Sequence, residues 1–287
     1  MPRRRSGSSR MAEPVVRIFD SGESMAAAVA SAFVSLVGQA PPAVAHGAPI
    51  HEIALTGGSI SRVIHREMAG LASSVDWSRV RFWWGDDRFV PTASQDRNAA
   101  QAWSDLLSVL VSSPAGALPR AHVMAMPASD EVRDVNTAAD VYSDIVRAEG
   151  TGGFELVMLG VGPDGHVASL FPHHPAAALT NRIAVPVTDS PKPPPERVSL
   201  TFEAFARSAR VWFVVSGEDK AEAVARALAS HTPRGEAAAS DEDPNDAWSD
   251  PLVRDTPARG VRGQVETVWW LDQGAASLLP HRAETHA

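Results

Sequence analysis

The sequence predicts an α/β protein with a mostly parallel, doubly wound sheet flanked by helices. Short runs rich in β-branched residues alternate with longer helical patterns, an arrangement that produces parallel strands joined by right-handed crossovers. The run 154–159 is almost free of polar side chains, as expected for a central strand covered on both faces. Because 44% of the 287 residues are hydrophobic, the chain can bury a large core.

The expected elements follow one another to residue 279. The Val/Ile/Phe run 15–19 is the first strand, and Asp20 or Ser21 can cap the helix that follows it to about residue 37. A loop rich in Pro, Ala and Gly, 39–49, leads to the second strand. The further strands expected are 50–55, 80–84, 154–159, 182–187, 197–201, 211–215 and 265–271. The further helices expected are 61–71, 98–110, 137–147, 220–229 and 275–279.

Two segments fall outside this alternation. Residues 1–12 are basic and rich in Ser, and we expect a disordered tail in which Met11 is an alternative start. The stretch 230–262 is rich in Pro, Ala, Asp and Glu and has no periodicity, which favours a long surface loop. Too little chain follows it to form a second core, so we expect one α/β domain over residues 13–280.

Composition excludes several classes of protein. The formal net charge of −8 argues against a general nucleic-acid binder, which needs a basic face. The absence of cysteine excludes disulfides, thiolate catalysis and iron–sulfur clusters, and the histidines lack metal-ligand spacing. No apolar stretch is long enough to span a bilayer, and the basic start is not followed directly by an apolar region as in a secretory signal. We therefore expect a cytoplasmic protein without a bound metal.

Three strand ends share one pattern, in which a hydrophobic run is followed directly by a polar loop that contains glycine. These loops begin at Thr56, Gly85 and Gly160. In an open parallel sheet, ligands bind beyond the carboxyl ends of the strands. If the three strands are neighbours, their loops form one crevice, and we predict the functional site there.

The loop Thr56-Gly57-Gly58-Ser59 is a candidate phosphate cradle. Two glycines let backbone N–H groups approach an anion, the Ser59 hydroxyl adds a donor, and the next helix supplies partial positive charge. A tight strand-to-helix turn would explain the same residues. The loop lacks the lysine of a P-loop and the third glycine of a dinucleotide fingerprint, which argues against ATP and NAD.

Charged residues follow at two further places. Asp86 and Arg88 follow an aromatic strand, where the arginine can bind a phosphate with two parallel hydrogen bonds or form a local salt bridge. Four prolines between Asp189 and Arg197 stiffen the segment that carries Lys192, which suits a pre-formed anion clamp. A rigid surface loop is the alternative interpretation of that segment.

The third loop carries the strongest signal. Asp164-Gly165-His166 follows two glycines and precedes a helical run, 167–171, which Asp164 is placed to cap. His166 would then lie in the first turn, where the helix dipole favours the neutral imidazole that a general base needs. An ordinary surface histidine is the alternative, but the glycine-rich setting at a strand end favours catalysis.

Taken together, these motifs resemble the 6-phosphogluconolactonase family from about residue 13 to 280. The pattern Gly-Pro-Asp-Gly-His-Val-Ala-Ser-Leu-Phe-Pro over 162–172 is highly specific, whereas Gly-Gly-Ser alone is not. The other matching segments are 55–59, 84–91, 96–98, 191–197 and 270–272. The resemblance implies hydrolysis of 6-phospho-D-glucono-1,5-lactone to 6-phospho-D-gluconate, in the oxidative pentose phosphate pathway, without a cofactor. It also implies a fold related to glucosamine-6-phosphate deaminases and ribose-5-phosphate isomerases.

The resemblance implies roles for individual residues as well. His166 matches the catalytic histidine of the family, and Asp164 matches the acid two residues before it. The positions expected around the substrate and its phosphate are Gly57, Gly58, Ser59, Asp86, Arg88, Lys192 and Arg197. Two residues depart from the family pattern, since Ile60 stands where threonine is frequent and Asp87 where glutamate is usual. The first change removes a hydroxyl donor, and the second shortens a carboxylate.

The expected mechanism uses one base. His166 takes a proton from water as the water attacks C1 of the lactone, and backbone N–H groups or Arg88 stabilise the oxyanion. Two alternatives stay open, namely an isomerase or deaminase of related fold and a sugar-phosphate-binding module without catalysis. In each case the expected partner is a small phosphorylated molecule, bound by a monomer or a weak homo-oligomer.

Overall fold

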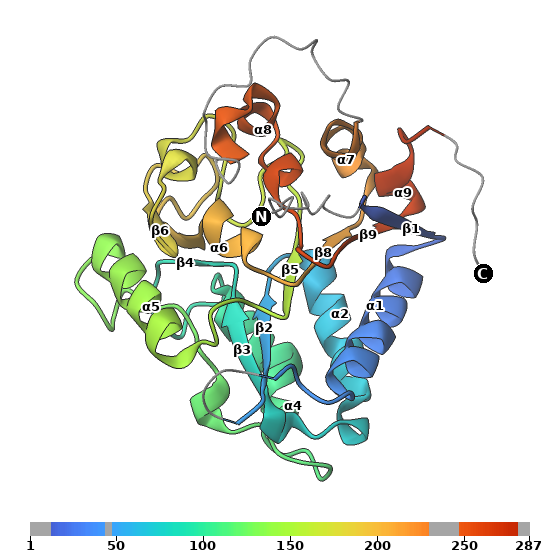
Figure 1. Cartoon of the computed structure of the whole chain (residues 1–287), viewed down its shortest axis with the longest axis vertical. Helices are drawn as coiled ribbons and strands as arrows, with labels where there is room; N and C mark the ends of the chain where they lie inside the picture. Colours follow the sequence, from blue (N-terminus) through green and yellow to red (C-terminus); the bar gives the residue numbers. More distant parts are fainter. Residues whose placement is uncertain (1–12, 44–47, 230–246, 281–287) are drawn as a thin grey trace, which may run out of the picture.

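Six parallel strands form the central sheet of the protein (Figure 1). In this computed structural model, which describes residues 13–43, 48–229 and 247–280, the strand order is β1-β9-β8-β5-β2-β3. Every neighbouring pair in this sheet is parallel, which confirms the predicted α/β class. The strands are β1 (Val15–Phe19), β2 (His51–Leu55), β3 (Val80–Trp84), β5 (Leu156–Leu159), β8 (Arg210–Val215) and β9 (Glu266–Asp272).

Two pairs of adjacent tryptophans show that both faces of the sheet are covered. Trp83 and Trp84 in β3, and Trp269 and Trp270 in β9, are each at most 2% exposed. Neighbouring side chains of a strand point to opposite faces, so each face must be packed against other elements. Trp269 stacks on Phe213 of β8 with ring centroids 4.0 Å apart. This packing holds the strand ends, and with them the loops that follow, in fixed positions.

The helices begin and end close to the predicted residues. Ser21 caps α1 by accepting a hydrogen bond from the backbone N–H of Ser24, and α1 packs beside α2 (Figure 1). A π-helical turn, Trp103–Leu107, interrupts the helix predicted over 98–110. The α-helices are α1 (Gly22–Val37), α2 (Ser59–Gly70), α3 (Asn98–Ala102), α4 (Ser108–Leu110), α5 (Val135–Glu149), α6 (Phe202–Ala206), α7 (Ala221–Leu228), α8 (Pro251–Asp255) and α9 (Gln273–Ala276). Short 3-10 helices span Ala72–Ser74, Trp77–Arg79, Arg120–His122, Pro175–Ala178, Glu218–Lys220, Ala247–Ser249 and Pro257–Gly260.

A second, antiparallel sheet stands beside the first. Its order is β4-β7-β6, with β4 (Asp86–Arg88), β7 (Arg197–Leu200) and β6 (Ala184–Val187). The prediction that Asp86 and Arg88 lie in a loop is therefore wrong. The chain makes a strand because Gly85 turns it away from β3, and Asp86 then pairs with Ser199. This sheet brings Arg88 and Arg197 to directly opposite positions on neighbouring strands.

The helix predicted over 167–171 is absent. Val167 instead pairs with Val161 and with Leu170, so that the segment folds back on the end of β5. The Ser169 hydroxyl donates to Asp86 Oδ2 at 2.6 Å, a tertiary contact that competes with helix formation. Asp164 therefore caps no helix, and no helix dipole acts on His166.

The structure describes only residues 247–262 of the surface loop predicted over 230–262. Residues 230–246 lie outside the described residues, as does the predicted tail 1–12. The rest of the stretch contains α8 and two short 3-10 helices, and it buries Val253, Ala258 and Val261 in the core. This part packs as folded structure because its few apolar side chains meet the main core.

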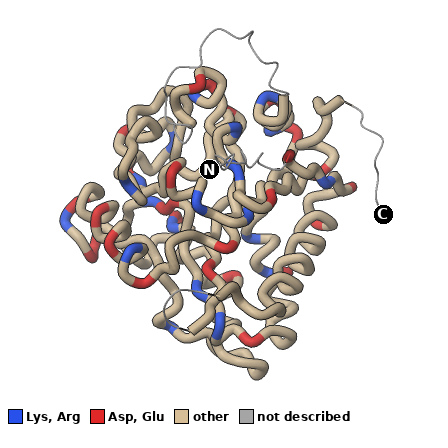
Figure 2. Tube along the Cα trace, viewed as in Figure 1, with Lys and Arg blue, Asp and Glu red and all other residues tan. Residues whose placement is uncertain are grey.

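Charged residues of both signs are mixed along the chain. Figure 2 shows lysine and arginine interspersed with aspartate and glutamate along the described trace. Across the described ranges, the helices are too short or too polar to cross a bilayer.

Candidate active site

The three predicted loops meet at one edge of the central sheet. They follow β2, β3 and β5, which are neighbours in the order β5-β2-β3. The backbone N–H of Gly160 donates to Thr56 Oγ1 at 3.3 Å, and the backbone N–H of Gly85 donates to the Leu55 carbonyl at 2.9 Å. The Ser169–Asp86 hydrogen bond ties the third loop to β4. The predicted convergence of the loops is confirmed.

Asp164 and His166 form a carboxylate–imidazole pair. Asp164 Oδ1 lies 2.5 Å from His166 Nδ1, and the imidazole is 15% exposed. A neutral imidazole that donates its Nδ1–H to this carboxylate keeps the lone pair of Nε2 available. Gly162 is required beneath the pair, because a Cβ there would overlap the imidazole. This pairing favours the tautomer with the proton on Nδ1, without the predicted helix.

Neighbouring cations stabilise the ionised form of Asp164. Burial alone would raise the pKa of Asp164, but the hydrogen bond and charge of His166, together with the charge of Lys192, lower it to about 2. Lys192 Nζ lies 3.8 Å from Asp164 Oδ1 and 3.4 Å from His166 Nδ1. Asp164 is therefore a carboxylate throughout the physiological range.

We predict that Asp164→Asn changes how stability depends on pH. The folded-state pKa of Asp164 is lowered from 3.8 to about 2, so its stabilising effect is complete above about pH 4 and is lost as the pH falls through 2. Urea unfolding between pH 5 and pH 2 should show a gap between wild type and Asp164→Asn that closes with acid. The matched control is Asp144→Asn, which removes an exposed ion pair with Arg147. A gap that stays constant over this range would contradict the assignment.

Arg197 holds the proline-rich loop in place. It is 4% exposed, and its guanidinium donates to the backbone carbonyls of Lys192, Pro193 and Pro194. Its Cζ also lies 5.7 Å from the ring centroid of Phe171. The rings of Phe171 and His166 pack together, with their centroids 4.6 Å apart. Arg197 therefore positions Lys192 beside the histidine, rather than presenting a free cation as the sequence suggested.

Arg88 keeps free donors at the other side of the crevice. Its Nη1 donates to the Asp96 carbonyl at 2.8 Å and to Asn98 Oδ1 at 2.6 Å. Its buried Nε has no partner among the described residues. The opposite strand position holds Arg197, and two like charges facing each other repel. An anion bound between them would relieve this repulsion, so the arrangement suits a phosphate or an oxyanion.

The adjacent aspartates Asp86 and Asp87 are buried and bond to other residues of the protein. Asp86 is 5% exposed, and its carboxylate accepts from Ser169 Oγ at 2.6 Å and from Asn98 Nδ2 at 3.3 Å. Asp87 is 1% exposed, forms an ion pair with Arg97, and accepts from the backbone N–H of Asn98 at 2.6 Å. These contacts fix β4 against the start of α3. The contacts of Asp86 also join β4 to the third loop, and its expected place at the substrate stays a prediction.

The glycine cradle lies at the start of α2. Gly58 is the N-cap residue with φ of 104°, a conformation that favours glycine, and its position carries no side-chain cap. Ser59 begins the helix, is exposed, and has no side-chain hydrogen bond within the described part of the chain. The first N–H groups of a helix and a free hydroxyl suit an anion. This geometry agrees with the predicted phosphate cradle.

Two residues near the site, Asn98 and Lys220, were not predicted as site residues from the sequence. Asn98 bridges Arg88 and Asp86, and its amide lies so close to Gly57 that a Cβ there would overlap it. Lys220 follows β8 and lies close enough to Lys192 to influence its charge. Burial lowers the pKa of Lys192. The charges of Lys220 and Arg197 lower this pKa further, whereas the charge of Asp164 raises it. The signal for Lys220 was present, since Ser216-Gly217 follows a hydrophobic strand as the other loops do.

No cluster of three or more His, Asp or Glu side chains in the described ranges is arranged to hold a metal ion. The expectation of an enzyme without metal or cofactor stays a prediction. The described crevice offers one imidazole, one carboxylate and several cations to a substrate. It can take up a proton at Nε2, hold an anion, and stabilise a developing negative charge.

Comparison with known proteins identifies relatives over most of the chain. Residues 20–270 match the family model described as glucosamine-6-phosphate isomerases/6-phosphogluconolactonase. The chain is 36% identical to a 6-phosphogluconolactonase of Mycobacterium tuberculosis over 270 residues, which are 92% of this chain and 98% of that one. It is 39% identical to a 6-phosphogluconolactonase of Streptomyces coelicolor over 237 residues, covering 79% and 82% of the two chains.

Solved structures show the same fold at lower identity. A 6-phosphogluconolactonase structure from Thermotoga maritima aligns with a TM-score of 0.68 at 24% identity, covering 91% of this chain and all of that one. A monomeric glucosamine-6-phosphate deaminase aligns equally well at 15% identity, covering 92% and 99%. The fold is therefore shared between lactonases and deaminases, as the sequence resemblance implied.

Proposed function

Because the chain belongs to the glucosamine-6-phosphate isomerase/6-phosphogluconolactonase family, we propose that it hydrolyses 6-phospho-D-glucono-1,5-lactone to 6-phospho-D-gluconate. Relatives at 36% and 39% identity bear the lactonase name, and one of them is covered almost completely. The observation that carries the proposal is the Asp164–His166 pair, in which Asp164 and Lys192 both lie at Nδ1 and Nε2 is left to act as the base.

The reaction needs one proton acceptor. His166 Nε2 takes a proton from water as the water oxygen bonds to C1, and the carbonyl electrons move to the oxygen, forming a tetrahedral oxyanion. The bond from C1 to the ring oxygen then breaks, and the imidazolium returns the proton to that oxygen. Asp164 stays ionised throughout and stabilises the imidazolium. The products are a free hydroxyl on the sugar and a carboxylic acid, which ionises.

The cationic residues hold the substrate. In the proposal, Ser59 and the N-terminus of α2 bind the phosphate with Lys192, while the free donors of Arg88 face either the phosphate or the oxyanion. Anchoring the phosphate fixes C1 relative to the water and Nε2, which lowers the entropic part of the barrier.

Acid release tests the function directly. Freshly generated 6-phosphogluconolactone is mixed with the full chain, and acid formation is followed against the spontaneous rate. Glucono-1,5-lactone without phosphate serves as the matched substrate. The proposal expects a large acceleration for the phosphorylated lactone only.

The alternatives predict other products. Conversion of glucosamine 6-phosphate or ribose 5-phosphate without lactone hydrolysis would instead indicate a deaminase or isomerase. Binding of sugar phosphates without turnover would indicate a sensor.

We predict that Arg88→Ala lowers kcat/KM by about tenfold or more, since one or two charge-assisted hydrogen bonds to the substrate are lost. Initial rates over a range of lactone concentrations measure the effect. Arg133→Ala is the matched control, because Arg133 is exposed and its partners among the described residues are Asp134 and Thr137. Unchanged kinetics of Arg88→Ala would rule out contact between this guanidinium and the substrate.

A further inference from the structure

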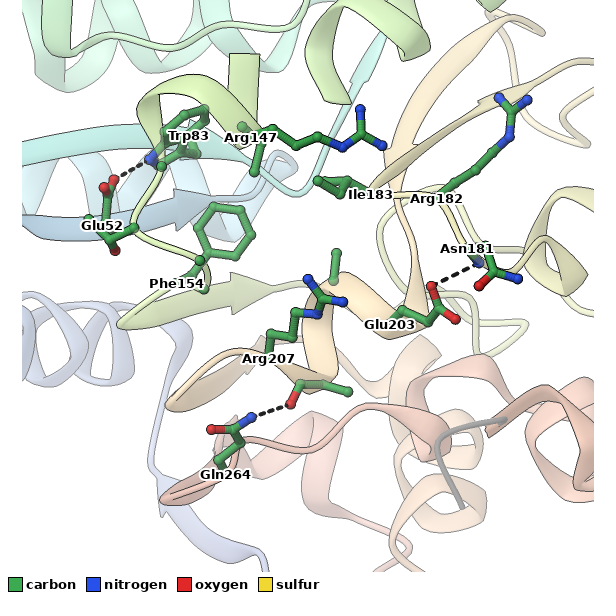
Figure 3. A pocket seen from close by; sticks show the side chains of 17 residues that line it. Glu52, Trp83, Arg147, Phe154, Asn181, Arg182, Ile183, Glu203, Arg207 and Gln264 are labelled. Atoms are coloured by element: carbon green, nitrogen blue, oxygen red, sulfur yellow. Dashed lines mark hydrogen bonds between the residues drawn. The ribbon is translucent and has the colours of Figure 1, made fainter. Parts of the chain in front are cut away.

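A pocket lies at the edge of the central sheet where β5, β8 and β9 begin, and Figure 3 shows the side chains that line it. Phe154, Arg207 and Gln264 line it, and they stand just before β5, β8 and β9 respectively. The active-site loops leave the other ends of the strands. Four strand residues span about 13 Å, so β5 separates the two sites. The pocket has a volume of about 730 Å³, within the range of small-molecule sites.

Three arginines from different parts of the fold line this pocket. Arg147 comes from the last turn of α5, Arg182 from the segment before β6, and Arg207 from the end of α6 (Figure 3). Arg207 has no ion pair or side-chain hydrogen bond within the described residues. An arginine with five donors and no partner is a ready anion ligand.

The other two arginines are only weakly engaged. Arg147 pairs with Asp144 at 2.7 Å and Arg182 with Asp140 at 3.1 Å, each through one nitrogen. All four side chains are about half exposed or more, and such pairs contribute little free energy. Each guanidinium therefore has further N–H groups available to a ligand.

Two acids also line the pocket, and one of them is neutralised. The Glu52 carboxylate accepts a hydrogen bond from Trp83 Nε1 at 2.6 Å and forms an ion pair with Arg81 at 3.2 Å. Burial raises the pKa of Glu52, although Trp83 and Arg81 both act to lower it. Glu203 accepts from the backbone N–H of Asn181 at 2.9 Å. Glu203 is thus the lining acid without an ion pair among the described residues. It shares the pocket wall with three arginines, of which Arg207 has no acidic partner in the described part of the chain.

We propose that this pocket binds a phosphorylated organic anion of nucleotide size, with its phosphates among Arg147, Arg182 and Arg207. The volume exceeds what inorganic phosphate needs, and Val146, Ile183 and Ala204 add apolar wall for the organic part. The site is independent of the proposed lactone hydrolysis, because it shares no residue with the crevice.

The test is calorimetric titration of the full chain with ADP, pyrophosphate and adenosine. We expect ADP to bind, pyrophosphate to bind more weakly, and adenosine not to bind. Arg207→Ala should weaken ADP binding tenfold or more, because it removes the arginine that lacks a protein partner. Arg207→Lys should restore part of the affinity, since it keeps the charge without the fork of donors.

Two control variants separate this site from the crevice and from surface charge. Arg88→Ala changes the crevice, and Arg133→Ala removes an exposed arginine. Neither should change ADP affinity by more than about twofold. ADP binding that is lost in Arg88→Ala, unchanged in Arg207→Ala, matched by adenosine or absent altogether would overturn the proposal. A failure of lactone hydrolysis would leave these outcomes unaffected.

Discussion

Replacement of His166 by alanine is expected to lower kcat by about 10²–10⁴-fold, the usual contribution of a positioned general base. The fold should survive, because the partners of the imidazole among the described residues, Asp164 and Lys192, both lie in loops. Acid release from the phosphorylated lactone measures kcat, and the melting temperature checks the fold. KM should change much less than kcat if the histidine acts on water and not on the phosphate.

The matched control is His173→Ala. His173 lies seven positions further along the same segment, is 67% exposed, and pairs with Asp255 instead of a crevice residue. Its loss should leave turnover within about twofold of wild type. Near-normal turnover in His166→Ala, or an equal loss in both variants, would exclude His166 as the base.

The position of the site could be predicted because it depends on strand order and strand ends. Hydrophobic runs in the sequence predicted β2, β3 and β5. Because these strands are parallel neighbours, their carboxyl ends lie at the same edge of the sheet. Polar loops with glycines at those ends therefore indicated the crevice. These strands could be predicted from local sequence because burial of the sheet requires hydrophobic residues along them.

Other features depend on contacts between distant residues, and no local pattern reports them. The run 167–171 has helical character, but Ser169 bonds to Asp86, more than eighty positions earlier. Asp86 and Arg88 form a strand only because β7 supplies its partner. For His166 the contact is local, since Asp164 is two residues away. The sequence prediction named both residues but gave Asp164 a helix-capping role, and in the fold Asp164 contacts the imidazole directly.

Asn98 shows the same limit most clearly. Its neighbours Asp96 and Arg97 made the segment look like an ordinary start of a helix. In the fold, Asn98 Oδ1 accepts from Arg88, while its Nδ2 donates to the Asp86 carbonyl at 2.9 Å. The side chain of Asn98 thus joins the start of α3 to β4, and it leaves no room for a Cβ at Gly57. Only the folded structure reveals that Gly57 has to be glycine for this to happen.

Gly57→Ala is therefore expected to lower kcat/KM by about 10²-fold, although the change adds a single methyl group. The new Cβ would overlap the Asn98 amide, which must move and release Arg88 Nη1. A displacement of about 1 Å in a substrate-positioning residue costs on this order. Gly70→Ala is the matched control at the other end of α2, where an added Cβ meets nothing within 4 Å. It should leave kcat/KM unchanged.

The double variant Gly57→Ala/Asn98→Ala shows whether the clash is the cause. Asn98→Ala alone frees Arg88 and should itself reduce kcat/KM about tenfold or more, but it also removes the amide that the new methyl group would strike. If the two residues act through one contact, the double variant should match Asn98→Ala and should not multiply the two losses. Multiplied losses would mean that Gly57 serves the substrate directly through its backbone, independently of Asn98. The cycle thus separates a steric requirement of the cradle from a role in holding the phosphate.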